Sequence, residues 1–150
     1  MLESPKGKVL AIAVRTAERG PMKELDSAAA VVDGGLVDDI PVSPDRGITF
    51  ISAEQWREVT AELRADLPWH TRRANVLVQG LKLADLKGRH IRVGEVEVAI
   101  EDETAPCGLM DRAHRGLKTA LKPDCRGGVY GRVIRAGSFK VGDDITVTPA

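Results

Sequence analysis

The chain has 150 residues and a mass of 16.2 kDa, with 43% hydrophobic and 29% charged side chains, which is typical of one globular domain spanning residues 1–150. Lysine plus arginine total 22 and aspartate plus glutamate total 22, so the net charge is zero and argues against a nucleic-acid coat protein. Apolar runs fall well short of the roughly 20 residues of a membrane span, and the first 20 residues are expected to lack a signal peptide's apolar stretch. We therefore expect a cytoplasmic protein that binds neither nucleic acid nor membrane.

Short alternating runs of valine and isoleucine between glycine and proline turns predict a mostly β chain. The predicted strands cover residues 8–14, 28–32, 47–51, 75–78, a hairpin over 90–100, 129–134 and 144–147. Residues 136–138 and 142–143 are expected to be connecting turns. About seven strands indicate a barrel or a sandwich.

Two helices are predicted to cover this β layer. The first begins after Ser52, whose hydroxyl can cap the first turn while Gln55 completes a capping box, and it ends before Pro68. The second follows Cys107 and ends before residue 123, although Gly116 opposes a continuous helix. The two apolar faces consist of Trp56, Val59, Leu63 and Leu67, and of Met110, Ala113, Leu117 and Leu121.

Cys107 joins a predicted strand to the second helix, where the unpaired amides of a helix start favour thiolate over thiol. Pro106 and Gly108 on either side suit the wall of a pocket. The alternative is that Cys107 is a small buried hydrophobe, the commoner fate of a lone intracellular cysteine. Cys125 is expected to be a bystander, because a disulfide would need oxidation and Cα atoms within about 7 Å. His114 lies two helical turns beyond Cys107, about 10 Å away, which is too far for a direct dyad.

Two segments are candidates for holding anions. Arg72, Arg73 and Asn75 directly precede a strand, and guanidinium forks match phosphate oxygens bidentately. Gly127 and Gly128 follow an arginine, and their amides could form a concavity around an anion. In both cases the alternative is a solvated turn.

The acidic pairs are assigned no chemistry. Asp38 and Asp39, together with the acidic runs at 101–103 and 143–144, lie in predicted turns, where solvated carboxylates are expected. Neither a Walker loop nor a dinucleotide-binding glycine motif occurs in the sequence.

In order along the chain, several segments resemble the MOSC domain, named for the C-terminal domain of molybdenum cofactor sulfurase. They are GKVLAI at 7–12, PM at 21–22, GGL at 34–36, RGITFIS at 46–52, RRANVLV at 72–78, GL at 80–81, LKGRHIRVG at 86–94, PC at 106–107, RGGVYGRV at 126–133 and VGD at 141–143. The resemblance covers almost the whole chain. It implies a β-rich, barrel-like fold.

The resemblance also implies a functional cysteine. In this family that position either carries sulfur as a persulfide or ligates molybdenum, and Cys107 occupies it. A cleft for the phosphate tail of the molybdenum cofactor (molybdopterin) is implied as well, with Arg73, Asn75 and Arg46 as binding residues and Lys23 as a weaker match. Asp38-Asp39 replaces the family's usual Gly-Asp. Pyridoxal phosphate binding is a further property associated with the family.

Three functions are open at this point. The first is a stand-alone MOSC-like domain that binds the molybdenum cofactor or transfers sulfur on Cys107, with a sulfur donor protein or a redox partner. The second is a molybdenum-dependent reductase of N-hydroxylated compounds that works with separate electron-transfer proteins. Transfer of that activity is unsafe, because amidoxime-reducing relatives carry a separate N-terminal β-barrel that this sequence is expected to lack. The third is a non-catalytic β-domain that binds a protein partner.

Overall fold

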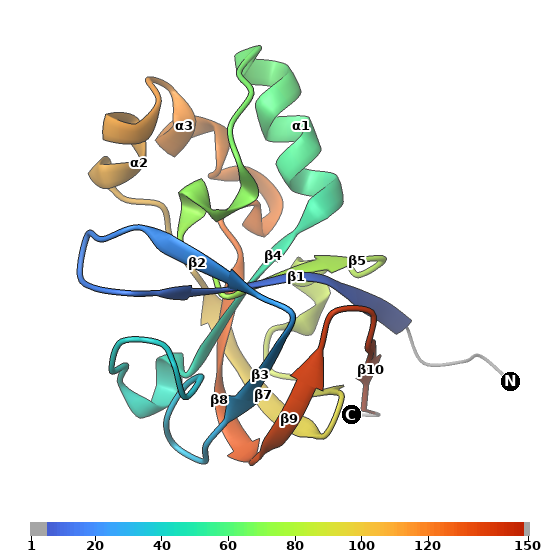
Figure 1. Cartoon of the computed structure of the whole chain (residues 1–150). Helices are drawn as coiled ribbons and strands as arrows, with labels where there is room; N and C mark the ends of the chain where they lie inside the picture. Colours follow the sequence, from blue (N-terminus) through green and yellow to red (C-terminus); the bar gives the residue numbers. More distant parts are fainter. Residues whose placement is uncertain (1–5, 149–150) are drawn as a thin grey trace, which may run out of the picture.

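Seven strands close into a barrel in the computed structural model, which describes residues 6–148 of the predicted 1–150 domain (Figure 1). Around the barrel the order is β1, β10, β6, β7, β8, β4 and β5, and β5 returns to β1. The strands are β1 Lys6–Arg15, β2 Met22–Leu25, β3 Ser27–Ala30, β4 Ile48–Ser52, β5 Val76–Gln79, β6 His90–Val93, β7 Val96–Glu103, β8 Val129–Arg135, β9 Gly137–Lys140 and β10 Asp144–Val147. The mostly β, barrel-like fold predicted from the sequence is therefore confirmed.

The long strand β1 closes the barrel. Its first residues, Lys6–Lys8, pair antiparallel with β10, and its remainder pairs with β5 and β2. The register with β5 shifts between Val9 and Ala11, and such a bulge bends a strand and increases its twist. The bend lets one strand serve two sides of the barrel. Among the strands within residues 6–148, only β4 and β5 pair in parallel, because the helix α1 (Ala53–Leu63) connects them.

Alternating side chains fill the barrel. In β7 the apolar residues Val96, Val98 and Ile100 are buried, while Glu97 between them remains partly exposed. This confirms the predicted hairpin with one solvated face. Inward-facing residues of the other strands join them in one core, including the fully buried Ile12 and Ile145.

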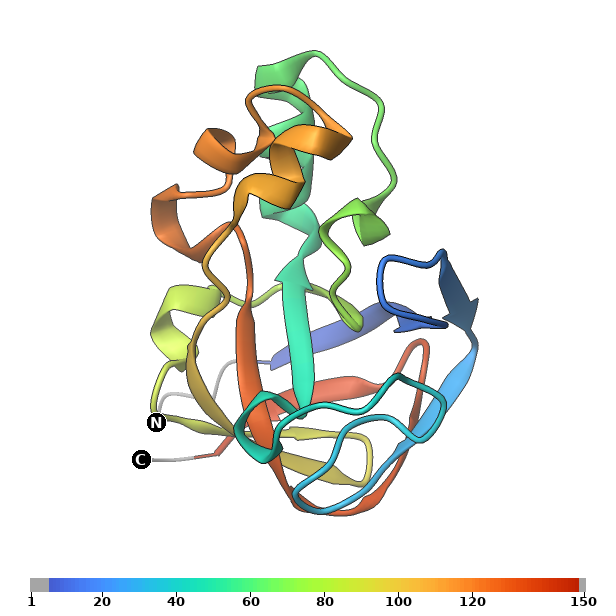
Figure 2. The same cartoon turned by 90° about the vertical axis from the view of Figure 1, so that its left-hand side faces the viewer.

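Three helices cap one end of the barrel: α1, α2 (Gly108–Ala113) and α3 (Leu117–Ala120) (Figures 1 and 2). They enclose a second apolar cluster, which consists of Ile51, Trp56, Val59, Ala74, Met110, Leu117 and Leu121. The short 3₁₀ helices are η1 Pro44–Arg46, η2 Trp69–Arg72, η3 Leu83–Leu86 and η4 Pro123–Cys125. Within residues 6–148, none of the helices is long and apolar enough to cross a membrane.

Helix α1 begins as predicted and ends early. Ser52 Oγ accepts a hydrogen bond from Gln55 N at 3.2 Å, but Gln55 Nε2 donates to Asp124 O at 2.7 Å, so only half of the capping box forms. The helix stops at Leu63, because Arg64 adopts a left-handed conformation with φ of 50°.

The second predicted helix is two helices. Between α2 and α3 the chain is extended at His114 and left-handed at Gly116, where φ is 91°. Asp111 Oδ1 then accepts a hydrogen bond from Lys118 N at 2.9 Å, which satisfies an amide in the first turn of α3. Consequently Ala113 is exposed, although it was predicted on the buried face.

Three strands outside the barrel differ from prediction. The strand predicted at 28–32 is β3, which ends at Ala30, and β2 was missed. Residues 137–140, predicted in part as a turn, form β9 and pair with β3. Phe139 on β9 is 2% exposed, so this small sheet packs its apolar side against the main core.

Candidate functional site

A cavity of about 280 Å³ opens where the helical cap meets the barrel. Five different parts of the chain build its wall: the end of β1, η1 with β4, η2, the segment from β7 into α2, and the turn after η4. The lining residues are Arg15, Arg46, Thr49, Arg72, Arg73, Ala74, Thr104, Cys107, Leu109, Met110 and Gly127. Four arginines and one thiol thus face a single small space.

Cys107 lies at the strand-to-helix junction, as predicted. It occupies the N-cap position of α2 with an extended backbone, and its carbonyl accepts from Met110 N at 3.0 Å. The residue is exposed and not disulfide-bonded. The alternative of a small buried hydrophobe is therefore wrong for Cys107, whose sulfur is open to reagents in the cavity.

Arg72 is a buried cation in the cavity wall, with only 8% of the residue exposed. Its Nε donates to Gly127 O at 2.9 Å and its Nη2 donates to Thr104 O at 2.8 Å. The remaining nitrogen, Nη1, contacts only the Met110 sulfur, at 3.9 Å, among residues 6–148. Burial lowers the pKa of the Arg72 guanidinium, a thiolate at Cys107 would oppose this shift, and the charge of Arg46 adds to it.

Within residues 6–148, no carboxylate forms an ion pair with Arg72. A buried charge without a counter-ion destabilises the site, because it has lost its hydration and gained only neutral acceptors in return. An anion in the cavity would remove that penalty.

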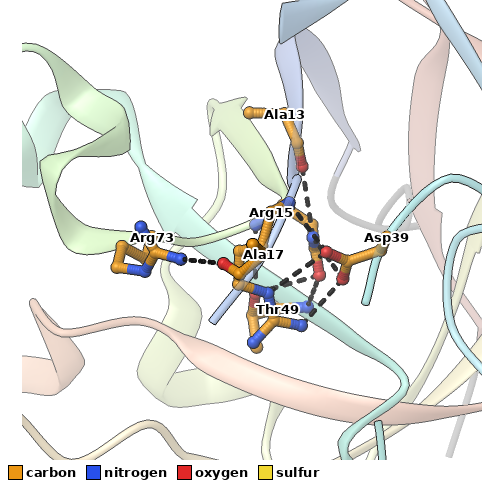
Figure 3. Close-up of polar contacts among 7 residues, drawn as sticks. Ala13, Arg15, Ala17, Asp39, Thr49 and Arg73 are labelled. Atoms are coloured by element: carbon orange, nitrogen blue, oxygen red, sulfur yellow. Dashed lines mark hydrogen bonds and ion pairs between the residues drawn. The ribbon is translucent and has the colours of Figure 1, made fainter. Parts of the chain in front are cut away.

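Arg15 is held by a buried carboxylate, Asp39 (Figure 3). The Asp39 side chain is 0% exposed, and it accepts from Arg15 Nη2 at 2.7 Å, Nε at 3.2 Å and the Arg15 backbone N–H at 2.8 Å. Burial raises the pKa of Asp39, but the hydrogen bonds and charge of Arg15 and a bond from Asn75 outweigh it and leave the pKa below its ordinary value. The prediction that Asp38 and Asp39 form a solvated turn is wrong for Asp39, while Asp38 is exposed.

Asn75 braces this pair from behind. It is 0% exposed, and its Oδ1 accepts from Thr49 N and Thr49 Oγ1, both at 3.1 Å. Its Nδ2 donates to Ala13 O and to Asp39 Oδ2, also at 3.1 Å each. The amide is committed to protein partners on both sides, so Asn75 positions the wall from outside the cavity lining.

Arg73 and Arg46 are the other two arginines that line the cavity. Arg73 directly follows η2 in a left-handed conformation, and its guanidinium donates to Gly20 O and to Ala17 O in the β1–β2 turn. Figure 3 shows the bond to Ala17. Burial and the nearby charge of Arg15 lower the pKa of Arg73. Arg46 lies over the Tyr130 ring, 4.9 Å from its centroid, which is a cation–π contact.

Comparison with known proteins places the chain in a family. The family model of the MOSC domain matches residues 37–146. The chain belongs to the MOSC domain family. The matched segment includes Cys107 and the Arg72–Asn75 element.

Solved structures share the fold of this MOSC domain. The YuaD protein from Bacillus subtilis superposes with a TM-score of 0.81 and 20% identity, covering 98% of each chain. YiiM from Escherichia coli gives 0.72 and 16% identity over 100% of this chain and 71% of its own. YiiM from Geobacillus stearothermophilus gives 0.71 and 18% over 95% and 75%. A search of curated proteins found no match.

The two glycines predicted to hold an anion lie in different surroundings in this MOSC domain. Gly127 is buried in the cavity wall, where an added Cβ would lie 2.6 Å from Thr104 O. Gly128 has φ of 100°, packs against Phe50 O and donates its N–H to Cys125 O at 2.9 Å. Because that amide is used inside the protein, the predicted concavity of two free amides does not form.

Two other residues from the sequence analysis lie elsewhere. Lys23 is exposed on β2 opposite Val14 and is not among the cavity-lining residues. Cys125 is 5% exposed within the barrel core, and burial, with the charge of Glu103, raises the pKa of its thiol. Neither residue lines the cavity that contains Cys107.

Sequence reasoning missed Arg15, Asp39, Thr104 and Met110 as parts of the site. Arg15 ends a strand and Asp39 lies in a loop 24 residues later, so nothing local connects them. Among these four residues, only Met110 had a signal in the sequence, because it was predicted on the apolar face of the helix that follows Cys107.

Proposed function

We propose that this MOSC domain carries sulfur as a persulfide on Cys107. The observation that supports the proposal is the exposed thiol in a cavity walled by four arginines. A persulfide places a negative charge on the outer sulfur, one bond farther from the backbone than the thiol. Cationic groups fixed around that position stabilise the charge as it forms.

The charge balance of the wall favours an anion. Arg15 is neutralised by Asp39, whereas Arg46, Arg72 and Arg73 form no ion pair with any carboxylate within residues 6–148. The cavity therefore carries a positive surplus beside Cys107. Such a surplus attracts anionic donors and retains the anionic product.

The transfer is a thiol–disulfide type exchange. Cys107 Sγ, having released its proton to solvent, attacks the outer sulfur of a donor persulfide. The donor's S–S bond breaks, its thiolate leaves, and a new S–S bond joins the transferred sulfur to Sγ. An acceptor nucleophile then removes that sulfur and returns Cys107 to its starting state. A sulfur donor protein or a small persulfide can fill the donor's role.

Intact mass spectrometry after incubation with a persulfide donor tests the proposal. Wild type and Cys125→Ser should gain about 32 Da, and Cys107→Ser should not. A thiol reductant must remove the added mass, because sulfinic acid has nearly the same mass and is not reduced. Retention of the reducible adduct in Cys107→Ser would refute Cys107 as the carrier.

Binding of the molybdenum cofactor is a second candidate, favoured by the length of the cleft. A neighbouring hollow of about 270 Å³ shares Arg15, Arg46 and Thr49 with the cavity and continues along residues 41–43. The donor set fits the group, because Cys107 would supply a thiolate for molybdenum and Arg46 and Arg73 would hold phosphate. The bound metal would supply redox chemistry. Protein produced in cofactor-competent cells should then copurify with molybdenum, and Arg73→Gln should lose it while Arg112→Gln retains it.

A further inference from the structure

The proposed sulfur carrier needs a source of sulfur, and the cavity indicates its chemical class. We propose that the donor is a small sulfur oxyanion of the thiosulfate class, held by Arg72 and Arg73 while Cys107 takes its outer sulfur. This inference rests on the proposed function. It adds the identity of the donor and the residues that bind it.

The charge of the cavity favours a small dianion. Three of the four wall arginines have no carboxylate among the residues that the structure describes. Thiosulfate carries two negative charges on a compact tetrahedral group. A protein persulfide presents one charge at the reacting sulfur, which leaves most of this positive surplus unmatched.

Arg72 has the geometry of a fixed oxyanion donor. Two backbone carbonyls hold its Nε and Nη2, so the guanidinium cannot rotate freely. Its Nη1 contacts only a thioether sulfur, at 3.9 Å, in the stretch from residue 6 to 148, and the side chain lines the cavity. A buried, preorganised N–H group without a strong acceptor recognises an oxyanion well, because binding requires no rearrangement.

The rest of the wall suits the sulfur end of the same ligand. Met110 is buried and Leu109 is exposed, and both line the cavity on the α2 side with Cys107. Met110 has a polarisable thioether and Leu109 an aliphatic side chain, so the wall near Cys107 also offers apolar groups to the ligand's sulfur. The wall therefore combines guanidinium groups for the oxygens with apolar side chains beside the nucleophile.

The reaction balances without a further reagent. Cys107 Sγ, with its proton lost to solvent, attacks the outer sulfur of thiosulfate and forms a new S–S bond. The bond between the two thiosulfate sulfurs breaks, and its electron pair leaves with sulfite. A thiolate and a thiosulfate dianion thus yield a persulfide anion and a sulfite dianion with the same total charge. The arginines hold the oxyanion before and after the bond breaks.

The test uses two donors on the full chain. Thiosulfate should load Cys107 with about 32 Da and release sulfite in equal amount, whereas Cys107→Ser should release none. Inorganic polysulfide, which has no oxyanion, serves as the second donor. If polysulfide loads Cys107 and thiosulfate does not, the donor class is wrong while the sulfur carrier stands. If neither loads Cys107, the proposed function itself fails.

Arginine variants test the binding role. Arg73→Gln and Arg72→Gln should lower kcat/KM for thiosulfate by about tenfold or more, mainly through KM, and should lower loading by polysulfide by a clearly smaller factor, because polysulfide has no oxyanion group for these guanidinium groups to bind. Arg112→Gln is the matched control, because Arg112 is exposed on α2 outside the cavity lining. Unchanged thiosulfate kinetics in both cavity variants would overturn the assignment.

A measurement on wild type covers the case in which loss of the buried Arg72 prevents folding. Sulfate, an unreactive tetrahedral dianion, should then inhibit competitively against thiosulfate, because both occupy the same arginines, and should inhibit loading by polysulfide less. Inhibition that does not respond to thiosulfate concentration would place the oxyanion elsewhere and overturn the proposal.

Discussion

Replacing Asp39 by asparagine tests whether one buried carboxylate holds the arginine wall. Asp39 Oδ1 accepts from the backbone N–H and Nε of Arg15, and Oδ2 accepts from Arg15 Nη2 and Asn75 Nδ2. In asparagine one of these two oxygens becomes an amide nitrogen, which cannot accept, so one pair of donors loses its acceptor. Two hydrogen bonds to a charged acceptor are lost, at about 1.5 kcal/mol each. This is the low end of the usual range, chosen because Arg15 keeps 21% of its side chain exposed. We expect Asp39→Asn to lose about 3 kcal/mol of unfolding free energy.

Urea denaturation at pH 7 measures this loss, with Asp38→Asn as the control. Asp38 is exposed, so its substitution should change the free energy of unfolding by no more than about 0.5 kcal/mol.

The contribution of Asp39 to the free energy of unfolding should also depend on pH. The folded-state pKa of Asp39 is lowered, so the stability from its ionised form is present above the unfolded-state pKa of about 3.9 and is lost as the pH falls through the folded-state value. The gap between wild type and Asp39→Asn should thus hold from pH 7 to about 5 and narrow below about 4. An equal stability of both proteins at pH 7, or a gap that widens in acid, would refute the reasoning.

Three further predictions concern packing and accessibility. Gly128→Ala should destabilise the protein severely in urea titration, because the added Cβ would lie 2.2 Å from a backbone oxygen of β4; Gly142→Ala has a similar φ of 95° with open space around it and should cost only about 1–2 kcal/mol. Equal losses in the two variants would show that φ alone matters. Leu117→Ala removes a side chain that is 0% exposed in the capping cluster and should lower the free energy of unfolding by about 2–5 kcal/mol, so a loss below 1 kcal/mol by the same titration would contradict the packing. Iodoacetamide should modify Cys107 alone in the native protein, as peptide mass mapping would show, because Cys125 is buried and burial raises the pKa of its thiol; native labelling of Cys125 would disprove its burial.

The barrel strands could be predicted because their period-two pattern survives in the sequence. Three of these segments are short runs of apolar or alternating residues, of the length that is typical of a strand and too short for a helix. They are residues 8–14, 47–51 and 129–134. The strands β2 and β9 were missed because they are four residues long and carry few β-branched side chains. Their conformation comes from pairing with β1 and β3, which local sequence does not reveal.

The site was predictable only in its local parts. Cys107 at a strand-to-helix junction and the arginines before β5 are visible as short motifs. The burial of Asp39 depends on a loop that folds across the end of β1, and the sequence shows only two adjacent acids of which one is exposed. The break of the second helix at Gly116 was signalled by the glycine itself.

The pairing of β1 with β10 has a consequence for synthesis of the protein. Lys6–Lys8 pairs with Asp144–Thr146, so the first described strand waits for the last one before the ring of hydrogen bonds is complete. While the polypeptide emerges from the ribosome, the two barrel edges left by an absent β10 stay open to other chains. Contacts so distant in sequence also slow folding. Synthesis therefore has a vulnerable interval that ends only when residue 147 leaves the exit tunnel.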